Sequence, residues 1–335
     1  MSGNNSDENN GAMFALLFPG QGSQSVGMLG ELLASETVVR QSFDEASEAL
    51  GYDMQALVAD NPDGKLNQTE FTQPALLTAS TALLRLWRQR GGANAAHAAG
   101  HSLGEYSALV AAGSLQFTDA VQLVAYRGRV MSEAVPEGVG LMAAILGLED
   151  ALLESLCDDA SEATEKVWPA NYNCPGQLVV AGHVGAVERL IDLAKQAGAK
   201  RALPLQVSAP SHTPLMQAAA DLMRVRLAGV NISKPSIPVW SNALAAPLSD
   251  AAAIRDALVS QLVSPVRWSE TIRNMHRSAG VLSAVEMGPG KVVSGIVRRV
   301  ERTMRVHATD TSAAMDKALE AISEALSEPL SGGES

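Results

Sequence analysis

The segment Gly100-His101-Ser102-Leu103-Gly104 has the G-x-S-x-G spacing of a nucleophile elbow. The two glycines permit the strained turn that pushes the serine hydroxyl above a sheet. A short apolar strand is expected before this turn and an alanine-rich helix after it, and the N-terminus of that helix would offer N–H groups to a developing oxyanion. The pattern predicts a serine nucleophile, with an ordinary tight turn as the alternative.

A serine nucleophile needs a base, and His212 has the most distinctive surroundings of the six histidines. It lies in Ala209-Pro210-Ser211-His212-Thr213-Pro214, where Pro214 suits the first position of a helix and Thr213 suits its cap. His101 is adjacent to Ser102, so we expect its ring to point away from the serine hydroxyl. The sequence therefore favours His212 as the base.

Arg127 is expected to point into the protein. On the helix predicted over Thr118 to Val135, its neighbours three and four positions away are Leu123, Val124, Val130 and Met131. Arg129 has polar neighbours instead and should be exposed. A buried guanidinium needs an anion, so we expect either a bound carboxylate or an internal Asp or Glu beside Arg127.

Gln261 lies near the end of the helix predicted from Asp250 to Val263, four residues before Pro265. Proline has no N–H, so the Gln261 carbonyl loses its helical donor. We expect this carbonyl to be able to accept the Nδ1–H of His212 and fix its tautomer.

Three other features receive structural interpretations. We expect the carboxylate of Glu105 to interact favourably with the dipole at the N-terminus of the helix that follows Ser102. Gly288-Pro289-Gly290-Lys291 lacks the phosphate-loop spacing and predicts a strand-to-helix turn. Cys174, followed by Pro175-Gly176, is expected to be a small apolar filler, and neither cysteine has metal-ligand spacing.

Alternating strands and helices predict an α/β protein with a parallel sheet. A second pattern begins near Gly138 and has the order βαββαβ, which is typical of a ferredoxin-like module inserted into a larger domain. We therefore expect a large domain over residues 13–137 and 209–323, a small one over 138–208, and a cleft between them. The strands expected in chain order are Phe14–Phe18, His97–Gly100, Val139–Leu146, Val167–Asn173, Gln177–Ala181, Arg201–Val207, Ser236–Ser241 and Val281–Glu286.

Composition narrows the class of protein. The net charge of −11 argues against a nucleic-acid-binding protein, which needs a basic footprint. There is no apolar run long enough to cross a bilayer, and the polar start does not resemble a signal peptide, so we expect no membrane association and a cytoplasmic protein. Disorder is expected over residues 1–12 and 326–335. A monomer is expected.

The chain resembles the malonyl-CoA:acyl carrier protein transacylases in four motifs that occur in the family's order. These are Phe18-Pro19-Gly20-Gln21-Gly22-Ser23-Gln24, Gly100-His101-Ser102-Leu103-Gly104-Glu105, Tyr126-Arg127-Gly128 and Pro210-Ser211-His212. A late loop, Val285-Glu286-Met287-Gly288-Pro289-Gly290-Lys291, is similar as well. The resemblance covers the chain from about Phe14 to Ile322.

The resemblance implies an α/β-hydrolase-like large domain with a ferredoxin-like small one. It implies that malonyl moves from malonyl-CoA to Ser102 and then to the phosphopantetheine thiol of acyl carrier protein, in fatty acid synthesis and without a cofactor. By motif, Ser102 would be the nucleophile and His212 the base. The N–H groups of Gln21 and Leu103 would bind the oxyanion, Arg127 the malonyl carboxylate, and Gln261 would support His212.

Three alternatives remain open from the sequence. A trans-acting acyltransferase of a polyketide synthase would share these motifs. An α/β-hydrolase-type thioesterase would have the order Ser, acid, His, with His276 or His307 as base and Asp221 or Asp256 as acid. A non-catalytic docking module would be credible if Ser102 or His212 were replaced, and both are intact.

Overall fold

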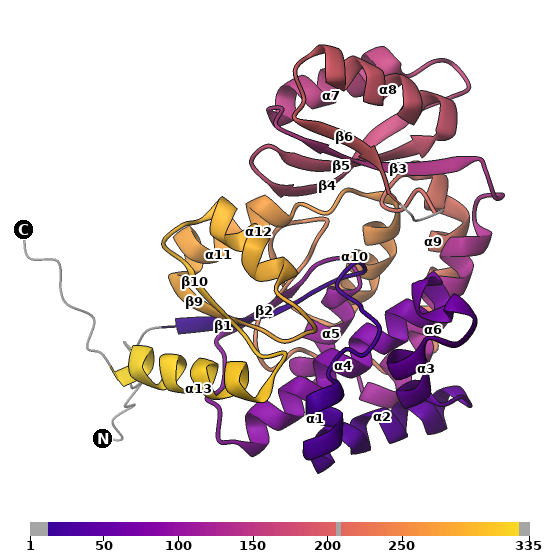
Figure 1. Ribbon diagram of the computed structural model, residues 1–335. Helices are drawn as coiled ribbons and strands as arrows, with labels where there is room; N and C mark the ends of the chain where they lie inside the picture. The colour runs from indigo at the N-terminus through magenta and orange to yellow at the C-terminus, as the bar shows by residue number, and fades with distance from the viewer. Residues whose placement is uncertain (1–12, 206–208, 328–335) are drawn as a thin grey trace, which may run out of the picture.

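The computed structural model describes residues 13–205 and 209–327 and is built on two sheets (Figure 1). The larger sheet has six strands in the order β10-β9-β1-β2-β7-β8, all parallel except β8 at one edge. The smaller sheet has four antiparallel strands in the order β4-β5-β3-β6. It forms a separate layer above the larger unit, covered by α7 and α8 (Figure 1).

The larger unit contains the first and last parts of the chain. Its strands are β1 (Met13–Phe18), β2 (His97–Gly100), β7 (Val239–Trp240), β8 (Pro247–Leu248), β9 (Val281–Glu286) and β10 (Arg305–Ala308). Its helices are α1 (Gly30–Ser35), α2 (Thr37–Leu50), α3 (Met54–Asp60), η1 (Pro62–Asn67), α4 (Thr69–Gln89), α5 (Gly104–Ala111), α6 (Phe117–Glu133), η2 (Pro214–Met216), α9 (Gln217–Ala228), α10 (Ala251–Val263), α11 (Trp268–Ala279), α12 (Val292–Val300) and α13 (Ser312–Ser327).

The smaller unit follows the order strand, helix, strand, strand, helix, strand. Its elements are β3 (Gly140–Leu146), α7 (Asp150–Ala160), β4 (Val167–Cys174), β5 (Gln177–His183), α8 (Val184–Gln196) and β6 (Arg201–Pro204). It has its own apolar core, in which Leu153 of α7 and Leu190 of α8 pack with Ile145 of β3.

Strand β1 shows why the larger sheet is buried on both faces. Phe14, Leu16 and Phe18 belong to one apolar cluster with α4 and α6, whereas Ala15 and Leu17 belong to another with α11 and α12. A parallel strand covered by helices on both faces is continuously apolar, as this segment is.

The parallel pairing of β1 with β2 sets the position of the elbow. Phe18 pairs with Gly100, so the loop after β1 and the turn after β2 leave the sheet at the same edge. Strand β7 lies on the other side of β2, and its carboxyl end brings Asn242 to that edge as well. Ligand sites of open α/β sheets lie outside the carboxyl ends of the strands.

Most expected elements are present, with shifted ends. The strand His97–Gly100 is confirmed in full, and the strand expected over Ser236–Ser241 is reduced to Val239–Trp240. The helix expected over Thr118 to Val135 begins one residue earlier and ends two residues earlier, as α6 (Phe117–Glu133), and Phe117 packs into the core at its start. The short strands β8 and β10 and helices α11 and α13 were not expected.

The expected disorder from residue 326 is wrong at its start, because α13 continues through Ser327 with its apolar side, including Ile322, on the core. Residues 1–12, 206–208 and 328–335 lie outside the described residues. Three expectations therefore lie outside them as well: disorder in the rest of the two tails, the end of the strand expected to reach Val207, and the domain boundary at 208.

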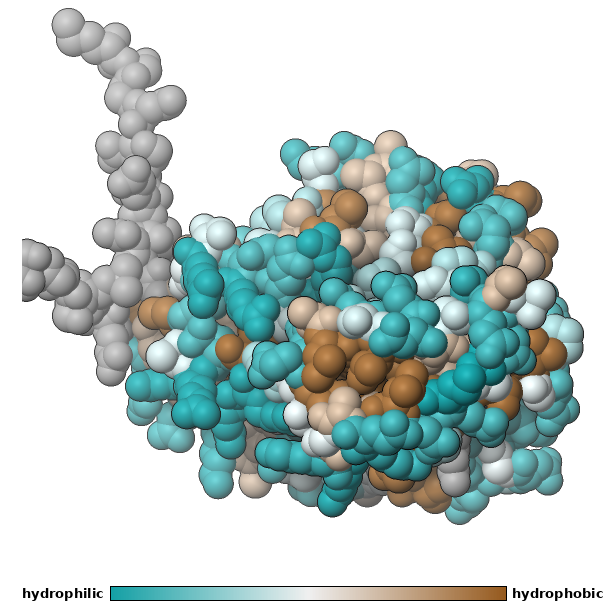
Figure 2. Space-filling model, turned by 90° about the horizontal axis from the view of Figure 1, so that it is seen from above, coloured by the Kyte–Doolittle hydropathy of each residue, from teal (hydrophilic) through white to brown (hydrophobic). Residues whose placement is uncertain are grey.

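The surface seen from above is mostly hydrophilic, with a compact hydrophobic group near the middle of that face (Figure 2). Among the helices of the described residues, none is long and apolar enough to cross a membrane.

Candidate active site

Ser102 lies in a tight turn between β2 and α5 and has left-handed backbone geometry, with φ of 50°. The two glycines around it are required by packing. A Cβ on Gly100 would lie 1.8 Å from the Gly104 carbonyl carbon, and one on Gly104 would lie 2.2 Å from the Phe18 oxygen. A positive φ is uncommon for a residue other than glycine and marks stored strain. The nucleophile elbow expected from G-x-S-x-G is confirmed in its geometry.

His212 contacts Ser102 directly. Its Nε2 lies 2.8 Å from Ser102 Oγ, and its Nδ1 lies 2.7 Å from the backbone oxygen of Gln261. A carbonyl oxygen only accepts hydrogen bonds, so Nδ1 carries the proton and the neutral ring presents a lone pair at Nε2. The Ser102 hydroxyl then donates to Nε2, the arrangement a general base requires.

The imidazole of His212 is held neutral. Burial lowers its pKa to about 3, and the positive charge of Arg127 acts in the same direction. The hydrogen bond to the Gln261 carbonyl raises the pKa but does not outweigh burial. A neutral ring is the form that can accept the serine proton.

Arg127 is buried, with 1% of its surface exposed, and points from α6 toward Ser102. Its Nη1 donates to Gln73 Oε1 at 2.8 Å, and its Nη2 donates to Gln261 Oε1 at 2.9 Å and approaches Ser102 Oγ at 3.4 Å. Within residues 13–205 and 209–327, no Asp or Glu forms an ion pair with it. The cation is held by two neutral amides and lies over the Tyr106 ring; burial lowers its pKa, and the buried negative charge of Glu105 acts to raise that pKa without forming an ion pair. Since no carboxylate of the described residues contacts the guanidinium directly, a bound carboxylate remains compatible with this geometry.

Gln21 and Leu103 both line the cavity in front of Ser102. Among the described residues, neither of their backbone N–H groups donates to another atom of the chain. Leu103 immediately precedes α5, so its N–H is at the positive end of that helix. Both groups are available to an oxygen atom placed beside the serine.

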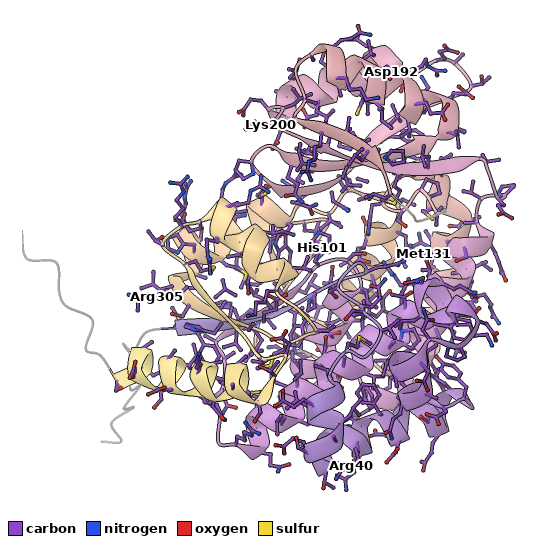
Figure 3. All side chains as sticks on the ribbon, viewed as in Figure 1. Arg40, His101, Met131, Asp192, Lys200 and Arg305 are labelled. Atoms are coloured by element: carbon purple, nitrogen blue, oxygen red, sulfur yellow. The ribbon has the colours of Figure 1, made fainter. Side chains whose placement is uncertain are left out.

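The cavity has a volume of about 390 Å³ and lies between the two units. The larger unit contributes Ser102, His212 and Arg127, and the smaller unit contributes Met142, Asn171 and Leu205. His101 and Met131, which also line it, lie in the region where the larger unit faces the small sheet (Figure 3). The expected interdomain cleft is therefore present at the nucleophile.

Glu105 makes contacts that its sequence context did not indicate. It lies in the first turn of α5, as a residue favouring the helix dipole would, but it is completely buried. Its Oε2 accepts hydrogen bonds from Gln261 Nε2 at 2.8 Å and from the N–H of Asn242 at 3.0 Å. Burial raises the pKa of this carboxyl to about 7. Glu105 is buried because its side chain packs against Gln261 of α10. The pattern of apolar residues within α5 alone does not reveal this contact between two helices.

Two residues of the site were missed from the sequence. Asn242 Oδ1 accepts the N–H of Ser102 at 2.6 Å, and its Nδ2 donates to the Gly100 oxygen at 2.6 Å, so it clamps the strained turn. Gln73 solvates Arg127. A polar pair, Ser241-Asn242, at the carboxyl end of a short apolar strand was the signal for the first; Gln73, inside the long apolar helix α4, gave none.

The other candidate residues lie elsewhere. His276 contacts Val281 and Thr303, and neither it nor His307 contacts Ser102. The His101 ring faces away from the hydroxyl as expected, with its Nε2 2.8 Å from Asn173 Oδ1.

The other two features with structural interpretations are as expected. Cys174 is buried, and burial raises the pKa of its thiol, which fits a small apolar filler. The 288–291 segment is the expected strand-to-helix turn, between β9 and α12.

Comparison with known proteins agrees with this geometry. A family model described as "Acyl transferase domain" matches residues 15–326. The malonyl CoA-acyl carrier protein transacylase of Salmonella typhimurium is 53% identical over 306 residues, covering 91% of this chain and 98% of that protein. The Bacillus subtilis transacylase is 44% identical over 310 residues, covering 92% and 97%.

Solved structures of the same family superpose closely. The transacylase of Coxiella burnetii has a TM-score of 0.91 at 45% identity and covers 95% of this chain and 99% of that one. A malonyl-transacylase in complex with a type II PKS acyl-carrier protein has a TM-score of 0.90 at 48% identity and covers 92% and 100%. This chain therefore belongs to the acyl transferase family and, within it, to the malonyl CoA-acyl carrier protein transacylases, which are acyltransferases.

Proposed function

We propose that this chain transfers malonyl from malonyl-CoA to the phosphopantetheine thiol of acyl carrier protein through a malonyl-Ser102 intermediate. The observation that carries the proposal is the placement of a buried arginine, without a carboxylate partner among the described residues, 3.4 Å from the hydroxyl of a serine–histidine pair. The high identity to transacylases over nearly the whole chain supports the same activity.

In the first half-reaction His212 Nε2 removes the proton of Ser102 Oγ as that oxygen attacks the thioester carbonyl of malonyl-CoA. The carbonyl oxygen becomes an oxyanion, which the N–H groups of Gln21 and Leu103 stabilise. The tetrahedral intermediate collapses, the C–S bond breaks, and Nε2–H gives its proton to the departing coenzyme A thiolate. The products are malonyl-Ser102 and coenzyme A, and His212 is neutral again.

The second half-reaction reverses these roles with a new thiol. His212 Nε2 takes the proton of the phosphopantetheine thiol, whose sulfur attacks the malonyl ester, and the same two N–H groups bind the oxyanion. Collapse breaks the bond to Ser102 Oγ, which recovers its proton from Nε2–H. No cofactor enters this scheme, and the exchange of one thiol for another is a ping-pong mechanism.

Arg127 selects the acyl group in this proposal. Its Nη2 lies close enough to Ser102 that a carboxylate two bonds beyond the attacked carbonyl can accept a charge-assisted hydrogen bond from it. Binding a carboxylate there gives a direct anionic contact to a guanidinium whose short hydrogen bonds go to the neutral amides of Gln73 and Gln261. A neutral acyl group leaves that charge uncompensated.

Two pathways could use this reaction. We propose fatty acid synthesis, the role that the resemblance to the malonyl-CoA:acyl carrier protein transacylases implies, and curated relatives at 52–53% identity carry that family's name. A trans-acting acyltransferase of a polyketide synthase is the second candidate, because one similar structure is a transacylase bound to a type II PKS acyl-carrier protein. A thioesterase with His276 or His307 as base has no support, since Ser102 contacts His212 instead.

We propose that the acidic carrier protein docks on a basic face formed by α12. Arg298 and Arg299 are exposed on α12, Arg302 is exposed in the turn after it, and Arg305 is exposed at the start of β10. Lys200-Arg201 is a second basic pair, on the smaller unit. Positive side chains on an otherwise acidic chain would steer an acidic partner to the mouth of the cleft.

We also propose that the two units are the α/β-hydrolase-like and ferredoxin-like domains. The alternation of helices with a parallel sheet supports the first, and the βαββαβ order with strands β4-β5-β3-β6 supports the second. The proposed domains run over residues 13–137 with 209–323, and over 138–208. A monomeric, cytoplasmic enzyme remains our expectation.

Acylation of the intact protein tests the proposed function. We expect wild-type protein incubated with malonyl-CoA to gain the mass of one malonyl group, and acetyl-CoA to label it far more slowly. An unlabelled protein that also fails to release free coenzyme A would contradict the proposal, because rapid hydrolysis of the ester would still release it.

A further inference from the structure

Glu105 is a buried carboxylate for which the two half-reactions have no use. It lies three residues after Ser102 and is completely buried. One of its oxygens, Oε2, accepts two hydrogen bonds, whereas Oε1 has no partner among the described residues. Burying a carboxylate is costly, so its contacts should matter to the site.

The first contact fixes the side chain of Gln261. The amide nitrogen of Gln261 donates to Glu105 Oε2 at 2.8 Å and to the Ser102 oxygen at 2.9 Å, and the amide oxygen accepts from Arg127 at 2.9 Å. A flipped amide would turn its NH₂ toward the guanidinium and its oxygen toward two acceptors. Glu105 is one of the two acceptors that exclude that orientation.

The second contact fixes the loop of Asn242. The N–H of Asn242 donates to Glu105 Oε2 at 3.0 Å, and the side chain of Asn242 holds the first half of the elbow through Ser102 N–H and the Gly100 oxygen. The same carboxylate oxygen therefore joins the elbow to Gln261.

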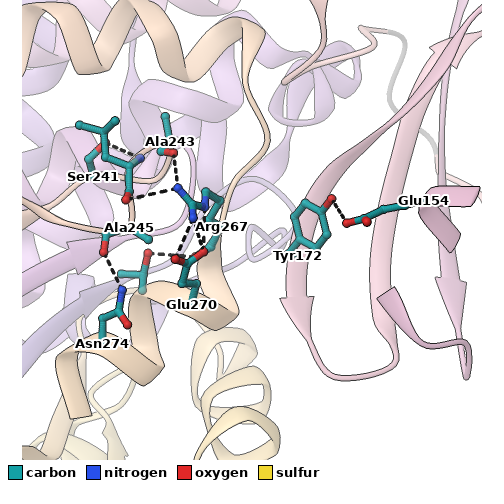
Figure 4. A network of polar contacts seen from close by, with 10 residues as sticks. Glu154, Tyr172, Ser241, Ala243, Ala245, Arg267, Glu270 and Asn274 are labelled. Atoms are coloured by element: carbon teal, nitrogen blue, oxygen red, sulfur yellow. Dashed lines mark hydrogen bonds and ion pairs between the residues drawn. The ribbon is translucent and has the colours of Figure 1, made fainter. Parts of the chain in front are cut away.

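The far side of the Asn242 loop is held by further hydrogen bonds, and Glu105 holds the side of the loop that faces the elbow. The Arg267 N–H donates to the Asn242 oxygen at 2.9 Å. Its guanidinium contacts the carbonyls after Asn242 and pairs with Glu270, and Asn274 donates to the Ala245 oxygen at 3.0 Å (Figure 4).

We propose that Glu105 is a positioning residue for malonyl recognition: by accepting from Gln261 and Asn242, it orients the Gln261 amide that presents Arg127 to the substrate carboxylate. This inference rests on the proposed function. The proposal gives two groups of Gln261 different roles. The backbone carbonyl, which binds His212, is needed for transfer of any acyl group, whereas the side-chain amide, which binds Arg127, is needed only for an acyl group with a carboxylate.

The test compares acylation by malonyl-CoA and acetyl-CoA in Glu105→Met and Glu105→Gln. Methionine fills a similar volume and accepts only weakly, so we expect the malonyl-to-acetyl ratio of kcat/KM to fall about tenfold. Glutamine keeps an acceptor oxygen, so we expect it to restore the ratio to within about threefold of wild type. An unchanged ratio in Glu105→Met would overturn the proposal, as would an equal fall in both variants.

Glu286→Met is the matched control. Glu286 is another buried carboxylate and accepts from Val293 and Ser294 at the start of α12. We expect it to lower Tm while leaving the malonyl-to-acetyl ratio unchanged, since both acyl groups depend equally on folding. A ratio that falls as far in Glu286→Met as in Glu105→Met would overturn a specific role for Glu105.

Should Glu105→Met not fold, Gln261→Ala decides the question. It removes the amide and keeps the carbonyl that binds His212, so a tenfold fall in the ratio supports the proposed relay and an unchanged ratio overturns it. Labelling of the wild type separates the two claims. If wild-type protein is malonylated and the ratio is insensitive, only the role of Glu105 fails; if wild type is never malonylated, both claims fail.

Discussion

The Gln261 backbone oxygen lies 2.7 Å from His212 Nδ1 and is the polar partner of that nitrogen. A neutral carbonyl fixes the tautomer of the ring without placing a negative charge beside it. The pKa of His212 is therefore governed by burial and by the nearby Arg127, both of which lower it. The pair is a serine–histidine dyad supported by a backbone dipole, and it differs in this respect from a triad with an acid.

This arrangement predicts an activity that persists in mild acid. A base whose pKa is lowered to about 3 stays deprotonated above that value, and activity is lost only as the pH falls through it. We expect the single-turnover rate of Ser102 acylation to change by less than about threefold between pH 8 and pH 5. A loss of about tenfold per pH unit below 6.5, the behaviour of an unshifted histidine, would contradict this.

Glu105 must be controlled in that measurement, because burial raises its pKa to about 7. Glu105→Gln removes this titration and keeps an acceptor. A profile that is flat in Glu105→Gln and sloped in wild type would assign the slope to Glu105, leaving His212 as described.

Removal of Arg127 should change selectivity more than it changes the chemistry. We expect Arg127→Ala to lower kcat/KM for malonyl-CoA by the equivalent of about 2–5 kcal/mol, with a much smaller loss or a gain for acetyl-CoA. Arg129→Ala is the matched control, because Arg129 lies on the same helix and is exposed, as its polar neighbours predicted. Retained malonyl preference in Arg127→Ala would refute the carboxylate role.

The elbow should not tolerate a methyl group at Gly104. A Cβ there would meet the Phe18 oxygen at 2.2 Å, and backbone atoms cannot move aside cheaply. We expect Gly104→Ala to lower the free energy of unfolding by about 3 kcal/mol or more, measured by urea denaturation. Gly295→Ala, on α12 with open space around the added carbon, should stabilise by about 0.5–1 kcal/mol. Equal effects at the two sites would count against the packing account.

Charge reversal on α12 should affect the second half-reaction alone. We expect Arg298→Glu with Arg299→Glu to slow transfer to acyl carrier protein by about tenfold, most strongly at low salt, and to leave acylation by malonyl-CoA unchanged. Arg299 also contacts Gln177 of the smaller unit, so Gln177→Ala is needed to remove that contact without changing charge. Equal losses in both half-reactions, or the same loss in Gln177→Ala, would argue against a docking role.

The sequence predicted those parts of the site that depend on local pattern. Helical periodicity predicted that Arg127 points inward, and the position of Pro265 predicted that the Gln261 carbonyl could accept from His212. Arg127 is buried, and the Gln261 carbonyl oxygen lies 2.7 Å from His212 Nδ1. The parallel sheet, the antiparallel sheet and the cleft followed from the order of apolar segments.

The missed contacts depend on tertiary packing. Glu105 had the sequence context of a helix-dipole residue, yet α10 buries it through Gln261. Asn242 reaches the elbow only because β7 pairs beside β2, a neighbour relationship that no local pattern encodes. Two-residue strands such as β7 and β8 are also too short for an alternating pattern to be recognised.

The central claim is that Ser102 carries the acyl group, and intact mass spectrometry tests it most directly. Wild type, Ser102→Ala and His212→Ala would each be incubated briefly with malonyl-CoA and quenched in acid. We predict one malonyl adduct on the wild type, none on Ser102→Ala, and slow, substoichiometric labelling of His212→Ala. A malonyl adduct on Ser102→Ala equal to that on the wild type would contradict the account.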